Sequence, residues 1–445
     1  MNSRHSRVSW PMALAMAIAL VGPLVSSCRP PGSSPPSATP SDASGSPGTE
    51  LTGEAVEPAP TIVPIPSAGI TLTWWTSEFF SPMAGGNSGE ILAEQVAGFV
   101  AANPDIGLQP ILKAAHGKGG ILDFLSTAKA GAPSILPDVV TIDSTDLPAA
   151  VQNKLLQPLD GLLSSELRED LFPFALSVGQ FEGQWYAVQF EADVEHLVYR
   201  TDKVRQAPIT WEELLSGTAT YIFAAAGRQE LINDASIIQY LGAGGRFDPG
   251  TRTLPLDEEP LRELLAFYQQ GVERGLIPAE VLTFDSVEAC WPAYLSEEAD
   301  MSNALASRYL GERTSVADTA FAASPTRDGR TLTTSRGWAL ALVATDAAHQ
   351  AASVQFIEWL LAPERSAAWS QAAGRLPTRN SALDLWGSED DYYTFLRSQL
   401  QAAVFRPSGG DSIDTSRRLQ QAVRAVLSGA ASLEEAISKA MVGAG

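Results

Sequence analysis

The sequence has few of the residues that cross-link small folds or bind metals. Its 445 residues include only two cysteines, Cys28 and Cys290, and no Cys-x-x-Cys pair. The four histidines are scattered along the chain: His5, His116, His196 and His349. We therefore expect no disulfide framework, no metal site and no cofactor, and we expect Cys290 to be a small buried apolar residue.

Basic residues are also scarce. The chain has 30 Lys and Arg against 51 Asp and Glu, a formal net charge of −21, and no cluster of Lys or Arg. Such an acidic body repels phosphate backbones, so nucleic-acid binding is not expected. The sequence also lacks a Gly-x-Ser-x-Gly elbow, a phosphate loop and a Gly-x-Gly-x-x-Gly turn, so several common enzyme classes have no motif here.

Only one long apolar run is present, from Trp10 to Val25, and it is too short for a comfortable membrane span. Arg4 and Arg7 precede it, as in an export signal. The run ends in Leu-Val-Ser-Ser-Cys, which resembles the lipobox of bacterial lipoproteins. That resemblance implies a signal peptide over residues 1–27, cleavage before Cys28, and a lipid on its thiol that anchors the chain to the membrane.

Residues 28–69 follow as a segment rich in Pro, Ser and Gly. A segment of this composition buries too little apolar surface to offset the entropy lost on ordering, so we expect a disordered tether. The remaining residues, 70–445, are more than one core usually supports, and two lobes are expected.

The exported body begins with alternating strand and helix patterns. The expected elements are strands at 70–76, 106–112 and 137–143 and helices at 89–102 and 121–130. This β-α-β-α-β order favours an α/β lobe with a parallel sheet, whose ligands gather at the carboxyl ends of its strands. The candidate ligand-binding residues at these ends are Trp74, Trp75, Ser77, Glu78, Asp143 and Ser144.

The stretch from Phe181 to Asp202 places two carboxylates, Glu191 and Asp193, between two runs that favour burial. One interpretation is a strand end that reaches solvent. The other is a passage between two lobes, with both acids facing a cleft.

This stretch, with its Phe-Glu-Ala-Asp and Leu-Val-Tyr-Arg-Thr-Asp strings, resembles the first interlobe crossover of the maltose-binding-like extracellular solute-binding proteins, family 1. Other strings fit the same family: NPDI at 103–106, PDVVTIDS at 137–144, LLQPLD at 155–160, Arg336-Gly337-Trp338, and GRLPTR at 374–379. The resemblance extends over nearly all of the exported body.

The resemblance implies an α/β, two-lobed periplasmic-binding-protein-like fold with three interlobe crossovers. We expect these near 190–193, 334–338 and 374–377. Lobe 1 would comprise residues 70–191 and 338–374, and lobe 2 residues 192–337 and 375–445. Hinge motion at the crossovers would close the lobes on a ligand.

The second half of the chain adds further candidate ligand-binding residues: Tyr240, Trp291, Asn303, Gly337, Trp338 and Arg375. For Tyr240, ordinary helix surface is the alternative. Asn303 lies where the chain departs from the family's usual strand. Trp338 can stack on a sugar ring, although a Trp in a strand is often part of the core. Arg308 is either a ligand fork or a surface charge.

The family implies a monomeric binding protein, not an enzyme, that captures a carbohydrate and delivers it to ABC transporter permease subunits. The expected location is extracytoplasmic, lipid-anchored to the outer face of the cell membrane. Alternatives are a glycoside hydrolase with paired carboxylates, a binding protein for a non-sugar solute such as glycerol-3-phosphate, and a surface adhesin or receptor.

Overall fold

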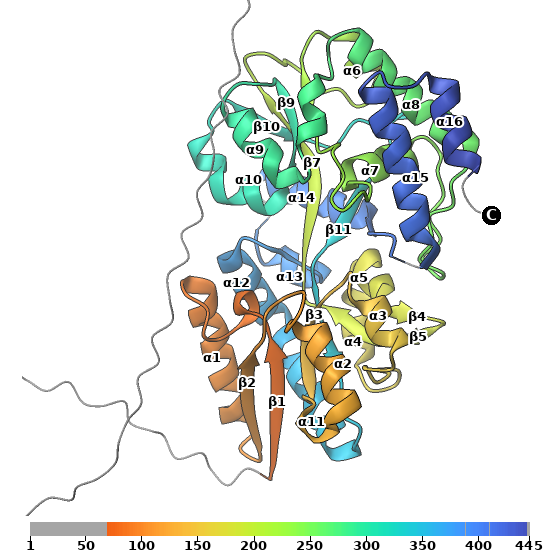
Figure 1. Ribbon diagram of the computed structural model, residues 1–445. Helices are drawn as coiled ribbons and strands as arrows, with labels where there is room; N and C mark the ends of the chain where they lie inside the picture. Colours follow the sequence, from red (N-terminus) through yellow and green to blue (C-terminus); the bar gives the residue numbers. More distant parts are fainter. Residues whose placement is uncertain (1–68, 388, 409, 443–445) are drawn as a thin grey trace, which may run out of the picture. The chain divides into compact units, whose positions relative to one another are not determined.

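The computed structural model describes residues 69–387, 389–408 and 410–442 (Figure 1). The expected signal peptide, Cys28 and all but the last residue of the expected tether lie outside these residues. Among the helices of the described ranges, none is both long and apolar enough to cross a membrane.

The first sheet has five strands in the order β2-β1-β3-β12-β6. Their bounds are β1 Ile70–Thr76, β2 Ile106–Leu112, β3 Val139–Asp143, β6 Ala187–Gln189 and β12 Trp338–Leu342. Strand β1 is parallel to β2 and β3, which confirms the expected opening, but β12 is antiparallel to both β3 and β6. The sheet is therefore mixed, because β12 and β6 join it from a later part of the chain.

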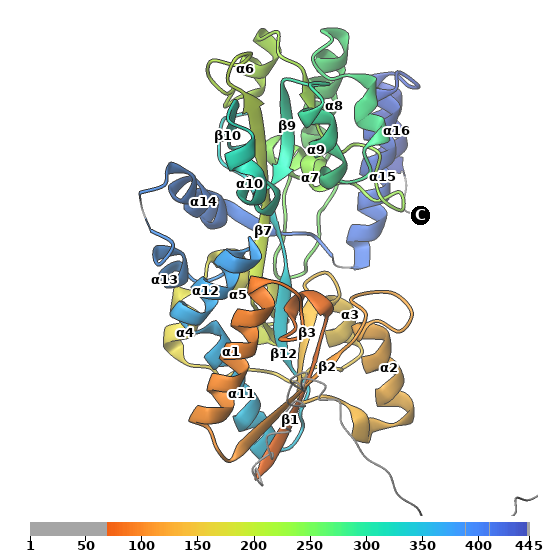
Figure 2. The same ribbon diagram turned by 90° about the vertical axis from the view of Figure 1, so that its left-hand side faces the viewer.

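Helices cover both faces of this sheet, as Figure 2 shows for α1 and α11 on one side and α2 on the other. The helices and turns of this part are α1 Asn87–Ala102, α2 Ile121–Gly131, α3 Leu147–Gln152, α4 Ser165–Asp170, α5 Pro173–Val178, α11 Ala347–Leu361, α12 Pro363–Ala373, η1 Glu78–Phe80 and η2 Pro133–Ile135. Successive residues of a strand point to opposite faces, so Trp74 packs against Phe356 of α11 and Trp75 against Phe124 of α2. A small hairpin, β4 Gln180–Phe181 with β5 Gln184–Trp185, precedes β6.

The second sheet has the order β14-β11-β7-β9-β8, with β10 and β13 also paired to β7. The bounds are β7 Glu191–Arg200, β8 Tyr221–Ile222, β9 Met301–Leu305, β10 Thr319–Ala322, β11 Thr333–Arg336, β13 Leu376–Pro377 and β14 Ala403–Phe405. The long strand β7 is its centre, because β9, β10, β11 and β13 all pair with it.

The remaining helices lie beside the second sheet. They are α6 Trp211–Ser216, α7 Asp234–Gly242, α8 Glu258–Glu273, α9 Val287–Leu295, α10 Ala306–Glu312, α13 Asn380–Asp384, α14 Asp391–Ala402, α15 Gly410–Leu427 and α16 Leu433–Val442, with η3 Ala279–Thr283 and η4 Arg313–Ser315. A capping box of Thr210 and Glu213 starts α6, and Trp211 stacks in the core on Phe267 at 4.5 Å between ring centroids. Cys290 is fully buried in α9, as expected.

The chain passes from one sheet to the other through connections of a single residue. Phe190 joins β6 to β7, and Gly337 joins β11 to β12. Residues 333–342 thus contribute two consecutive strands to different sheets. Glu191 is the first residue of β7 and Asp193 the third, and both are buried instead of forming a strand end that reaches solvent. They are 2% and 1% exposed, respectively.

Candidate ligand-binding site

A cavity of about 640 Å³ lies where residues of both sheets meet. The aromatic side chains on its wall come from Phe79, Phe80, Trp338 and Trp369. Its charged groups are Asp143, Glu191, Asp193, Glu288 and Glu312, with Arg308, Arg336, Arg375 and His116. A cavity that combines aromatic faces with converging polar groups is the usual form of a small-molecule site.

Glu191, the first residue of β7, has one carboxylate oxygen satisfied and one free. Its Oε1 accepts a hydrogen bond from the backbone N–H of Trp338 at 2.8 Å. Its Oε2 is buried and has no hydrogen-bond partner among the described residues. Burial raises the pKa of Glu191, and the nearby guanidinium of Arg375 offsets part of this rise, so that the pKa is about 8. Glu191 also contributes to the cavity wall, where a ligand can supply the missing donor.

Asp193 is fully occupied by protein donors. Its Oδ1 accepts from the N–H groups of Val194 and Ser307, each at 3.0 Å. Its Oδ2 accepts from Arg375 Nη1 at 2.9 Å and from the Ser307 hydroxyl. The carboxylate thereby ties the start of α10 and the segment after α12 to the centre of the second sheet.

Trp338 begins β12 and is opposite Asp143 in the register with β3. Its ring centroid lies 5.1 Å from that of Phe80 and 5.5 Å from that of His116. His116 is half exposed, with Nε2 3.7 Å from Asp143 and Nδ1 3.6 Å from Asp146. Burial and the nearby Asp143 raise the pKa of Asp146. The indole is partly exposed, and Trp338 lines the cavity together with His116 and Asp143.

Each arginine on the cavity wall already has a carboxylate partner. Arg375 pairs with Asp193, and Arg308 pairs with Glu312 at 2.7 Å. Arg336 donates to Glu288 at 3.4 Å and to the buried carboxylate of Asp234.

Asp234 also accepts a hydrogen bond from Arg406, which is not one of the residues that line the cavity. The two guanidinium groups of Arg406 and Arg336 hold the pKa of Asp234 below its usual range, against the effect of burial. The charge of Arg336 is thus compensated from two directions.

Asn303 is hydrogen-bonded to two other buried side chains, those of Glu195 and Tyr221, and none of the three lines the cavity. Asn303 donates to Glu195 Oε1 at 2.5 Å and accepts from the Tyr221 hydroxyl at 2.6 Å. Burial, with the nearby Asp234, raises the pKa of Glu195 to about 7. Asn303 is fully buried. It holds Glu195 in place and does not line the cavity.

The structure brings six of the fourteen candidate ligand-binding residues to the cavity wall. These are Asp143, Glu191, Asp193, Gly337, Trp338 and Arg375. They come from β3, β7, the β11–β12 connection and the segment after α12. Residues separated by more than 200 positions in the sequence thus face the same space.

The other eight candidates lie outside this wall. Seven are buried by protein neighbours: Trp74, Trp75, Ser77, Ser144, Tyr240, Trp291 and Asn303. The backbone N–H of Ser144 bonds the carbonyl of Gly337, and Glu78 is exposed in the turn after β1. Trp291 is 3% exposed and donates from Nε1 to Glu312, so it positions a wall residue. Tyr240 is not helix surface either, because its hydroxyl is held by Pro255 and Asp257.

Several wall residues were not expected from the sequence. His116 follows β2, and Phe79 and Phe80 follow β1, so the strand-end rule that selected Asp143 applies to them as well. Trp369 lies inside α12 and Glu288 inside α9, and no local pattern distinguishes either from a core or surface residue. The pairing of Arg336 with Asp234 is likewise visible only in the fold.

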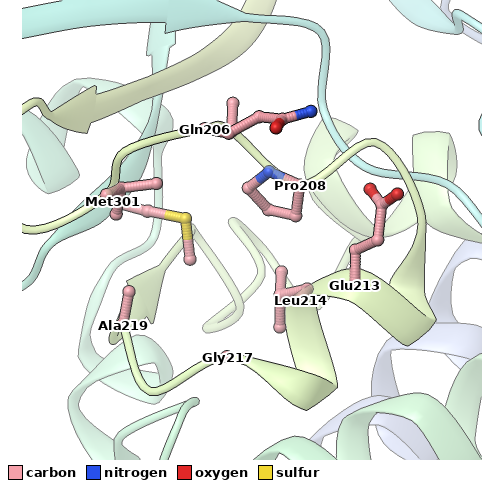
Figure 3. A pocket seen from close by; sticks show the side chains of 9 residues that line it. Gln206, Pro208, Glu213, Leu214, Gly217, Ala219 and Met301 are labelled. Atoms are coloured by element: carbon pink, nitrogen blue, oxygen red, sulfur yellow. The ribbon is translucent and has the colours of Figure 1, made fainter.

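A second hollow, of about 280 Å³, shares no lining residue with this cavity (Figure 3). Its lining includes Pro208, Leu214, Ala219 and Met301, and Glu213 is its one carboxylate. That carboxylate accepts from the N–H groups of Ile209 and Thr210 in the capping box. The hollow therefore offers no uncommitted charged group.

Comparison with known proteins gives one family and many similar folds. Residues 115–393 match the family described as bacterial extracellular solute-binding protein. No curated protein matches the sequence. The maltose-bound MalE3 of T. maritima is similar in structure, with a TM-score of 0.63, 20% identity, and coverage of 83% of this chain and 98% of that one.

Two further solved structures have the same fold. The sugar-binding protein MalE of Xanthomonas citri has a TM-score of 0.66 and 20% identity, covering 83% of this chain and 95% of its own. The cyclic alpha-maltosyl-1,6-maltose binding protein of Arthrobacter globiformis has a TM-score of 0.66 and 18% identity, covering 83% and 96%. These likenesses establish the two-lobed, maltose-binding-protein-like fold.

Proposed function

The chain belongs to the bacterial extracellular solute-binding protein family, and we propose that it captures a carbohydrate outside the cell for delivery to an ABC importer. One observation carries the choice of ligand: a cavity of about 640 Å³ in which an indole lies beside a buried carboxylate with an unsatisfied oxygen. Aromatic faces stack on the C–H surface of sugar rings, and carboxylate oxygens accept from sugar hydroxyls. Two of the similar structures are a maltose-bound protein and a binding protein for cyclic alpha-maltosyl-1,6-maltose.

The charge pairing in the cavity argues against an anionic solute such as glycerol-3-phosphate. Such a ligand needs arginines that are free to form bidentate hydrogen bonds. Here each arginine on the cavity wall already forms an ion pair with a protein carboxylate: Arg308, Arg336 and Arg375.

The hydrogen bonds of Asp193 argue against a glycoside hydrolase that uses Glu191 and Asp193 as its pair of carboxyl groups. Hydrolysis requires two carboxyl groups that are both free to act on the glycosidic bond. Asp193 accepts from the two N–H groups, a hydroxyl and a guanidinium described above, so it is not free to act as nucleophile or base. We propose a binding protein without catalytic activity.

Closure on the ligand would use the short passages between the sheets. We propose hinges near 190–193, 334–338 and 374–377, where few residues connect the lobes proposed from the sequence, 70–191 with 338–374 and 192–337 with 375–445. Permease subunits of the importer would recognise the closed form.

A thermal-shift screen of the full-length protein tests the ligand class. The panel contains mono- and oligosaccharides, polyols, sugar phosphates and peptides, and each hit is recovered and analysed for cleavage. A ligand at about 100 times its dissociation constant adds about 2.7 kcal/mol to the free energy of unfolding. Stabilisation by an intact saccharide is the expected result. Stabilisation by sugar phosphates or peptides alone, or a cleaved sugar, would contradict the proposal.

We further propose that a lipid on Cys28 anchors the protein to the outer face of the cell membrane. The Cys28→Ser variant should move from the membrane fraction to the soluble fraction, because it lacks the thiol that carries the lipid. The matched control is Cys290→Ser, which alters the only other cysteine and should leave the protein in the membrane fraction. Equal membrane association of both variants would exclude the anchor.

A further inference from the structure

Two carboxylates on the cavity wall lack a basic partner. The wall carries five acids and three arginines, and the three arginines are paired with Asp193, Glu288 and Glu312. Asp143 and Glu191 are left over. Within the described residues, neither has a Lys or Arg nitrogen within 4.0 Å, and only the half-exposed His116 lies near Asp143, at 3.7 Å.

The two unmatched acids are both neighbours of Trp338. Asp143 is directly opposite Trp338 across the β3–β12 ladder. Glu191 accepts from the backbone N–H of the same tryptophan at 2.8 Å. An indole face with carboxylates around it is a favourable environment for a cation, through both Coulomb attraction and the ring quadrupole.

The orientation of Glu191 gives an independent indication of a ligand at this point. The side chain is 2% exposed, it contributes to the cavity wall, and its Oε2 has no donor among the described residues. Burial raises the pKa of this group to about 8, so without a ligand it is largely protonated at neutral pH. An ammonium group of a ligand would favour the ionised carboxylate and supply the missing donor. Arg375 does not fill this role, because its Nη1 is bonded to Asp193.

We infer that the carbohydrate captured by this protein carries a positive charge, an ammonium group that binds Asp143 and Glu191 beside the indole of Trp338. The inference rests on the proposed carbohydrate-binding function and narrows its ligand to amino sugars or oligosaccharides that contain one. Neutral sugars would supply neither Asp143 nor Glu191 with a positively charged partner.

The test compares sugars that differ only in the amino group. The probes are glucosamine with glucose, galactosamine with galactose, and the β-1,4-linked glucosamine disaccharide with cellobiose, with each N-acetylated form as a third member. Calorimetry on the full-length protein measures the affinities. We expect at least one amino form to bind about tenfold or more tightly than both its hydroxyl and N-acetyl counterparts, the gain expected of a charge-assisted contact. This preference should disappear above the pKa of the amine.

Two variants test the residues, and a third is the control. Asp143→Asn and Glu191→Gln should each lower the ratio of amino-form to hydroxyl-form affinity about tenfold. Glu94→Gln, which changes an exposed acid of α1 outside the cavity, should keep the ratio. A change of the ratio by Glu94→Gln alone would point to long-range charge and overturn the assignment.

The outcomes separate this inference from the proposed function. If hydroxyl forms bind as well as or better than amino forms, the inference fails and carbohydrate capture stands. If an amino form is preferred but neither Asp143→Asn nor Glu191→Gln changes the ratio, the assigned position is wrong. If no saccharide of any form binds, both the inference and the proposed function fail.

Discussion

Arg375 and Asp193 form an ion pair of 2.9 Å that joins the segment after α12 to the central strand of the second sheet. Asp193 is 1% exposed at its side chain, whereas Arg375 is 39% exposed. The two partners therefore differ in their access to water. Water can solvate the arginine if its partner is removed, whereas the buried carboxylate depends on protein donors. Its other donors, from Ser307, fix the start of α10 at the same point.

Replacing Asp193 by Asn should lower the free energy of unfolding by about 1–3 kcal/mol, because the charge that attracts Arg375 and the Ser307 hydroxyl is lost. Urea unfolding measures the change. The control is Asp105→Asn in the exposed turn before β2, which should change stability by less than about 0.5 kcal/mol. An equal cost for both variants would show that the pairing of Asp193 contributes nothing.

Replacing Trp338 by Ala should weaken binding of the captured saccharide about tenfold or more, because the cavity loses its partly exposed ring face. The matched control is Trp359→Ala, which removes a partly buried indole that lies outside the cavity and bonds the Gln95 carbonyl. Calorimetry on both variants gives the affinities. If Trp359→Ala weakens binding as much as Trp338→Ala, the effect is one of general stability.

Stability should fall as the pH rises from about 4.5 to about 8. The folded state raises the pKa of Glu191 from 4.5 to about 8 and that of Glu195 to about 7, mainly through burial. In this window the folded chain holds more protons than the unfolded chain. Each such group therefore lowers the free energy of unfolding with rising pH, by up to roughly 1.4 kcal/mol per pH unit.

Glu191→Gln tests this assignment, because an amide does not titrate. Urea unfolding between pH 5 and pH 8 should show a smaller slope for this variant than for the unmodified protein, whereas Glu94→Gln should keep the original slope. An unchanged slope in Glu191→Gln would falsify the role given to its carboxyl group.

Gly337 allows the chain to change sheets between β11 and β12. Its φ is +155°, and a Cβ atom there would lie 2.1 Å from the carbonyl oxygen of Glu191. Gly337→Ala should therefore destabilise the protein by about 3 kcal/mol or more, since the obstacle is backbone.

The control for this variant is Gly131→Ala. Gly131 is the last residue of α2, and its added Cβ would meet no atom within 4 Å. It should be neutral or slightly stabilising. Yield of folded protein and urea unfolding distinguish the two variants. A well-folded Gly337→Ala protein of unchanged stability would contradict the close approach.

Local patterns in the sequence were sufficient for most of the first sheet. The strands at 70–76 and 106–112 and the helices beside them follow from apolar periodicity, which depends only on near neighbours. The capping box at Thr210 is equally local. For Glu191 and Asp193 the sequence left two interpretations open, an exposed strand end or a buried passage between lobes. Acids between two apolar runs need either solvent or protein partners, and the sequence does not show which of these is present.

Which aromatic residues face the cavity depended on the tertiary structure. Trp74 and Trp75 both lie near the end of β1, yet helices cover both faces of that sheet, so both indoles are buried. Trp338 remains partly exposed because it begins its strand at a passage between the sheets. No property of a tryptophan's immediate neighbours in sequence distinguishes these cases.

The charge balance of the site was also decided by the fold. Composition determined that the chain is acidic, and order along the chain determined its α/β class and its similarity to solute-binding proteins. Pairing of Arg336 with Asp234 and of Arg375 with Asp193 joins residues 102 and 182 positions apart. Coulomb energy depends on distance in space and on burial, so only the tertiary structure decides which carboxylates are left unpaired for a ligand.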